Sequence, residues 1–128
     1  MTKRKPNVYD PAPLIEAINK WPNPMFDKKH NLYIYVEGNA RSNQTRVEHI
    51  VDYRHDLKVR DLESIPDGIN KYFAYKKDPI YPNTYNYYIK RKGEDKGLIK
   101  LSIRISDDDH THAWVKTVYI TYHIKELL

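Results

Sequence analysis

The chain has 128 residues and a formal net charge of +5, from 22 lysines and arginines against 17 aspartates and glutamates. It contains no cysteine, which excludes disulfide bonds, thiolate metal ligands and thiol nucleophiles. No apolar run approaches the roughly 18 residues of a membrane span and no signal peptide is expected, so a cytoplasmic protein without membrane contact is predicted.

Basic charge and tyrosine dominate the composition. The positive charge favours acidic partners such as nucleic acid. The sequence also holds 12 tyrosines beside only 2 phenylalanines and 2 tryptophans. Tyrosine combines a stacking face with a polar tip, which suits RNA, but an AT-rich coding sequence produces the same bias.

The first 30 residues are expected to form an arm with a short helix. Residues 1–13 carry three prolines and a basic cluster. Pro13 can open a helix with Leu14 and Ile18 on one face, and the following Trp-Pro-Asn-Pro sequence ends it. Residues 31–128 are predicted to form a single domain.

Strand and helix patterns then alternate along the chain. Residues 31–37 alternate aliphatic residues with tyrosines, which is typical of a strand. A Thr-x-x-Glu capping box predicts a helix over residues 45–55, and further helical turns are expected over residues 61–65. Residues 69–75 fit either a helix or an edge strand.

Three strands are predicted in the last third of the chain, at residues 85–92, 98–106 and 114–124. The middle one alternates four aliphatic residues with polar ones. Because the connections are short, an antiparallel meander is the simplest topology, and the upstream helices are available to cover its apolar face. The predicted fold is therefore α+β, with N-terminal helices packed on one face of an antiparallel sheet.

The other face of this sheet gathers candidate binding groups. Facing positions on adjacent strands lie roughly 5 Å apart, so cations, hydroxyls and an imidazole are expected to converge there. These groups can bind phosphate and transfer protons, although a solvated sheet face has the same composition. The residues concerned are Lys100, Ser102, Arg104, Thr117, Tyr119, Thr121 and His123, with Lys90 or Arg91 from the neighbouring strand.

The predicted helix over residues 45–55 carries a second candidate set. Arg46 and His49 are three residues apart and so share a helix face, away from the aliphatic stripe. Arg54 and His55 follow at the C-terminal end, where the helix dipole favours a cation. Two histidines and an arginine can supply an acid, a base and an anion clamp. A charged helix surface explains the same residues without any function.

Other common chemistries are not indicated. Residues 107–112 hold three aspartates and two histidines, but without a metal-binding motif they fit a charged turn, so no metal is predicted. The four glycines form no phosphate-binding loop, and no nucleophile elbow is present. Nucleotide-dependent enzymes and serine hydrolases are therefore excluded.

The order of these features resembles a known nuclease superfamily. A strand is followed by Arg-x-x-His-Ile at residues 46–50, Arg-His at 54–55, Asp-Leu-Glu-Ser-Ile-Pro at 61–66, and three closing strands. Over roughly residues 31–125 this order is similar to the phage-type members of the barnase/EndoU/colicin/RelE-like superfamily. The resemblance implies that helices pack on one face of the sheet and that RNA is cleaved on the other.

The resemblance also implies residue roles. His49 is similar to the family's helix histidine, a general acid or base. Lys90 corresponds to the cation that neutralises the phosphate, and Thr121 to the hydroxyl that orients it, with Thr117 as the alternative if the register differs. Arg46 and His55 match further catalytic positions less closely. The implied reaction needs no cofactor: the ribose 2′-hydroxyl attacks the phosphorus and leaves a 2′,3′-cyclic phosphate.

The leading prediction is thus a metal-independent endoribonuclease, toxin-like or encoded by a phage or mobile element. It would act in a bacterial cell or a phage-infected host cell. Its expected partners are RNA, with tRNA and rRNA as candidates, and an acidic inhibitor or immunity protein. The alternatives are a non-catalytic RNA- or protein-binding module and a phage accessory or structural protein on the same fold.

Overall fold

The computed structural model describes residues 10–36, 47, 50–51 and 56–123. In this part of the chain the elements follow one another as α1 (Ala12–Asn19), β1 (Met25–Asp27), β2 (Leu32–Tyr35), α3 (Val59–Glu63), α4 (Ile65–Gly68), β3 (Ala74–Lys77), β4 (Thr84–Lys90), β5 (Leu98–Ile105) and β6 (His112–Thr121). The predicted α+β class is confirmed.

The strands form one six-stranded sheet in the order β1-β2-β6-β5-β4-β3. The predicted meander is confirmed, because β4, β5 and β6 pair antiparallel in sequence order. The prediction of a purely antiparallel sheet is wrong, because β2 pairs parallel to β6. Short turns constrain only consecutive strands, whereas β2 reaches β6 through a long crossover that includes the helices.

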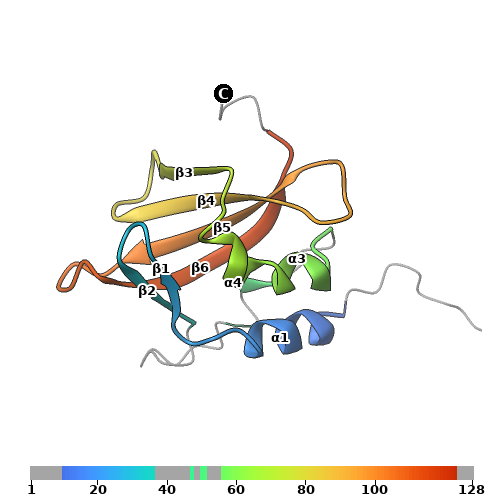
Figure 1. The fold of residues 1–128 in the computed structure, drawn as a ribbon, viewed down its shortest axis with the longest axis horizontal. Helices are drawn as coiled ribbons and strands as arrows, with labels where there is room; N and C mark the ends of the chain where they lie inside the picture. Colours follow the sequence, from blue (N-terminus) through green and yellow to red (C-terminus); the bar gives the residue numbers. More distant parts are fainter. Residues whose placement is uncertain (1–9, 37–46, 48–49, 52–55, 124–128) are drawn as a thin grey trace, which may run out of the picture.

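The sheet curls around the core, and the helices cover the part of the core that the sheet does not enclose (Figure 1). Trp21, just after α1, donates its indole N–H to the carbonyl of Leu62 in α3 at 2.7 Å, which joins the two helices. The core lies between the helices and the sheet. It is built from aliphatic residues of every layer, among them Ile18, Ile34, Leu62, Ile65, Ile69, Leu101 and Val118.

The central strand β5 follows the predicted alternation. Three of its aliphatic residues, Ile99, Leu101 and Ile103, are fully buried, and Arg104 is exposed on the other side. Ser102 lies on that same side, as the alternation predicts, but is only 8% exposed. Its hydroxyl donates to the Asn86 side chain at 2.5 Å on the neighbouring strand, and this contact covers it.

A β-bulge interrupts the pairing of β5 with β6. Ser102 pairs with Thr117, but Ile103 pairs with Val115, so Lys116 is the extra residue. Uninterrupted alternation would place Trp114 on the same side as the buried Val118. The bulge reverses which residues of β6 face the core, so Val115 is buried and Trp114 lies on the polar side of the sheet.

The segments that sequence patterns left less certain are also placed. The helical turns expected over residues 61–65 are present as α3 and α4, and the ambiguous segment 69–75 leads into an edge strand, β3. Most of the helix predicted over residues 45–55 lies outside the described residues. Val47 is half-buried and packs against the core, and Ile50 and Val51 are buried.

One buried ion pair connects α3 to the end of β4. The Asp61 side chain is 0% exposed and the Arg91 side chain 3% exposed. The guanidinium donates to both carboxylate oxygens, at 3.0 and 2.9 Å. It also donates to the backbone carbonyls of Lys96 and Asp56. The hydrogen bond to Asp61 raises the pKa of Arg91 above its usual range, so the guanidinium stays charged.

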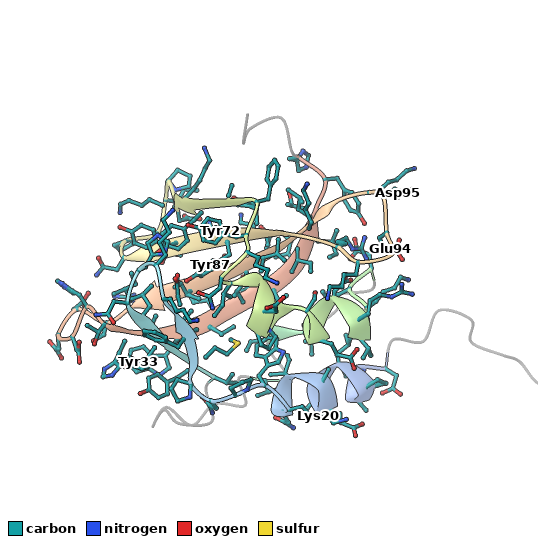
Figure 2. The ribbon with its side chains drawn as sticks, viewed as in Figure 1. Lys20, Tyr33, Tyr72, Tyr87, Glu94 and Asp95 are labelled. Carbon is teal, nitrogen blue, oxygen red and sulfur yellow. The ribbon has the colours of Figure 1, made fainter. Side chains whose placement is uncertain are left out.

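A second buried polar cluster connects β1 to β4 across the curled sheet. The carboxylate of Asp27 is fully buried; it accepts a hydrogen bond from the Tyr87 hydroxyl at 2.5 Å and lies 2.7 Å from Nδ1 of His30. Tyr75 stacks on the His30 ring, with the ring centroids 3.9 Å apart. The ring centroids of Tyr72 and Tyr87 are 5.8 Å apart (Figure 2). Burial raises the pKa of the Tyr87 hydroxyl, so it remains a donor.

Candidate functional site: the open face of the sheet

The side of the sheet opposite the core carries cations, aromatic rings and hydroxyls. We call it the open face. Residues paired across neighbouring strands point to the same side, and successive residues alternate, so the pairing register assigns its members. No acidic residue occupies an open-face position in any strand that the structure describes. The members on β4, β5 and β6 are Thr84, Asn86, Tyr88, Lys90, Leu98, Lys100, Ser102, Arg104, Trp114, Thr117, Tyr119 and Thr121. Four of them, Thr84, Asn86, Leu98 and Ser102, are buried by neighbouring side chains or loops.

Lys100 lies at the centre of this face between two tyrosines of the flanking strands. Its ammonium is 5.2 Å from the ring centroid of Tyr119 and 5.9 Å from that of Tyr88. Partial burial lowers the pKa of Lys100, but its hydrogen bond with Tyr119 and the nearby Tyr88 outweigh this effect and raise it overall. The lysine is therefore a fixed cation held between aromatic rings.

A row of aromatic rings extends the open face across β6, β2 and β1. Trp114 lies 6.1 Å from Tyr35, and His112 lies 5.5 Å from Tyr35 and 5.9 Å from Tyr33, between ring centroids. The row continues to Phe26, whose ring centroid lies 4.7 Å from that of Tyr33. Tyr33 is 40% exposed, at the end of the molecule farthest from the β4–β5 turn (Figure 2). Exposed rings in such a row can stack on nucleobases.

Two carboxylates lie at the rim of the open face. Asp78, just after β3, accepts hydrogen bonds from the Tyr81 and Ile80 backbone N–H groups and from the Asn86 amide. The first of these is the main reason that the pKa of Asp78 is lowered. Asp107 lies 3.5 Å from Arg104 and partly neutralises it. The positive charge of the face therefore comes mainly from its lysines.

Lys90 and Lys116 complete the set of lysines that contact aromatic rings on this side. The Lys116 ammonium is 4.7 Å from the ring of Tyr81, which is 57% exposed. The Lys90 ammonium is 5.6 Å from the ring of Phe73. Together with Lys100 and its two half-buried tyrosines, these contacts place cations next to aromatic rings at three points on this side.

The residues proposed from sequence fall into two groups. Lys90, Lys100, Arg104, Thr117, Tyr119 and Thr121 all lie on the open face, and Lys90 and Thr121 both pair with Leu98 from its two sides. His123 is exposed, two residues beyond the end of β6. Arg46, His49, Arg54 and His55 lie outside the described residues, so the structure gives no distance between the two groups.

Several open-face residues were not singled out from sequence. Tyr33 and Tyr35 oppose the buried residues of β2, a signal visible in the alternation, but their position beside β6 depends on the parallel pairing. The side on which Trp114 lies depends on the bulge, which was not predicted. These residues make the face more aromatic than the sequence suggested.

Comparisons with family models, with curated proteins and with solved structures find no match to this chain. Within the described ranges, no three histidine, aspartate or glutamate side chains are grouped so that they could hold a metal ion. No described helix combines the length and apolar character required to cross a bilayer.

Proposed function

We propose that this protein binds single-stranded RNA on the open face of its sheet. The observation that carries the proposal is the position of Lys100 between Tyr88 and Tyr119 on a face whose described strand positions hold no acid. Proteins that bind single strands combine cations for the phosphates with aromatic rings for the bases. The open face offers both.

A single strand fits this face better than a duplex. In a duplex the bases are stacked on one another and their faces are hidden, so exposed rings cannot stack on them. On the open face, the row from Trp114 to Phe26 presents rings along several strands, and the lysines lie beside it. The net charge of +5 supports the same class of partner.

Salt dependence tests this proposal. Affinity for a short fluorescent single-stranded RNA, measured by anisotropy over a range of salt concentrations, is expected to fall with a slope of about −0.7 in log K against log salt for each phosphate contact. Lys100→Ala is expected to flatten that slope by about one contact. The 2′-O-methyl form of the RNA is used so that cleavage cannot interfere.

Lys20→Ala provides the matched control, because Lys20 is the C-cap residue of α1 and its side chain is 72% exposed (Figure 2). This variant loses the same charge from the helical side of the protein and is expected to bind as the wild type does. An absence of binding, or an equal effect of the two substitutions, would contradict the proposal.

A second candidate function is metal-independent cleavage of the bound RNA. It is favoured by the row in which Lys90 and Thr121 flank Leu98 on the open face, since these two residues have the chemistry to neutralise and orient a phosphate. His49 is proposed as the acid or base. The ribose 2′-hydroxyl would lose its proton and attack the phosphorus, and the 5′-oxygen would leave with a proton.

Substitution of His49 tests the cleavage candidate. His49→Ala is expected to slow cleavage of tRNA or rRNA by roughly 10²–10⁴, the usual contribution of a positioned proton-transfer group. Wild-type cleavage should persist in EDTA and leave 2′,3′-cyclic phosphate ends. His110→Ala, in the exposed turn between β5 and β6, serves as the control. If the wild type leaves RNA intact, or if His49→Ala cleaves normally, this assignment is wrong.

A further inference from the structure

A pocket of about 390 Å³ opens at the end of the sheet where β4 ends and β5 begins. Its walls include Phe73, Lys90, Gly97 and Leu98, with Glu94 and Asp95 from the β4–β5 turn. Lys90 and Leu98 also belong to the open face, so the pocket continues that face beyond the last row of paired residues. Its volume is in the range of small-ligand sites.

The pocket combines an aromatic wall with a cation. The Phe73 ring is 42% exposed, and the Lys90 ammonium lies 5.6 Å from its centroid. Arg91 also lines the pocket, but its guanidinium is committed to Asp61 and to backbone carbonyls. Lys90 is therefore the group available for a phosphate, and Phe73 the surface available for a flat ring.

Two carboxylates are located on the β4–β5 turn, which forms one wall of the pocket. Figure 2 shows Glu94 and Asp95 at this end of the molecule, on the turn between β4 and β5. Within the described part of the chain, neither carboxylate has a hydrogen-bond or ion-pair partner. Asp95 is exposed and Glu94 half-buried. Both carboxylates can therefore accept hydrogen bonds from a ligand. They lie beside the Phe73 ring, on which a nucleobase could stack.

We infer that this pocket receives one base of the bound strand and selects a base that carries an exocyclic amino group. The inference rests on the proposed RNA binding. The base would stack on Phe73, its phosphate would contact Lys90, and its amino group would donate to Glu94 or Asp95. Carboxylates accept from amino groups such as cytosine N4. Uracil has no amino group, and its N3–H lies between two carbonyl oxygens that would face the carboxylates.

Oligocytidylate and oligouridylate of equal length, both 2′-O-methylated, test the inference. They differ at each base mainly by an amino group in place of a carbonyl, and they carry the same backbone charge. The wild type is expected to bind the cytidine oligomer at least about fivefold more tightly, the lower bound for one discriminating contact. The double variant Glu94→Ala, Asp95→Ala, which removes both acceptors, is expected to lose this preference, and Phe73→Ala to weaken binding of both oligomers. Asp108→Asn, on the exposed β5–β6 turn, removes a charge elsewhere and is expected to keep the preference.

The outcomes separate the two proposals. Equal affinity of the wild type for both oligomers overturns the pocket assignment and leaves RNA binding in place. A preference that survives in the double variant also overturns it, because the selectivity then arises elsewhere. If neither oligomer binds, the proposed RNA binding itself fails, and the pocket assignment fails with it.

Discussion

Asp61→Ala is expected to destabilise the protein by about 3–5 kcal/mol, because the Arg91 guanidinium would stay buried without its counter-charge. The two side chains are 0% and 3% exposed and share two hydrogen bonds. Asp61 also accepts from the Lys58 backbone N–H at 2.9 Å, so the substitution removes the cap of α3 as well. Urea denaturation followed by tryptophan fluorescence measures the effect.

Asp67→Ala is the control for this prediction. Asp67 pairs with Lys71 at 3.3 Å, but both side chains are more than half exposed. Loss of such a surface pair is expected to cost less than about 1 kcal/mol. Replacement of both buried partners, with Asp61→Leu and Arg91→Met together, should recover part of the stability, because no uncompensated charge remains. If Asp61→Ala is no worse than Asp67→Ala, the buried pair does not have the assigned role.

Trp114→Ala is expected to weaken binding of single-stranded RNA by about 1–3 kcal/mol, the cost of losing one stacked base. The bulge at Lys116 places this indole on the open face, 6.1 Å from Tyr35 and paired with Arg104. Trp114→Phe retains a stacking surface and should keep most of the affinity. Anisotropy titration gives the affinities, and thermal melting verifies that both variants fold. Wild-type affinity in Trp114→Ala would contradict the role of this ring.

The sequence predicted the parts of the fold that depend on neighbours along the chain. Strands β4, β5 and β6 are linked by short turns, and β5 alternates in polarity, so their pairing and the buried side of β5 could be derived. The parallel pairing of β2 with β6 could not, because it joins segments that are far apart in sequence. The Asp61–Arg91 pair escaped prediction for the same reason.

The candidate site was predictable to a similar extent. Alternation placed Lys100 and Thr121 on one face, and the register agrees; it left Lys90 or Arg91 open, and the pairing with Leu98 selects Lys90. Trp114 could not be assigned, because a bulge of one residue reverses its side without altering the pattern before or after it. Phe73 lay in a segment that fitted two structures equally well, so the pocket it lines could not be foreseen.

The two tryptophans provide the most direct test of RNA binding on the open face. Trp114 lies on that face, whereas Trp21 is 6% exposed, with its indole N–H bonded to Leu62 on the helical side. The indole N–H signals of both residues are followed by NMR while single-stranded RNA is added. The account predicts that the Trp114 signal shifts progressively and that the Trp21 signal stays in place. A shift of Trp21 alone, or of neither signal at saturating RNA, would contradict binding on the open face.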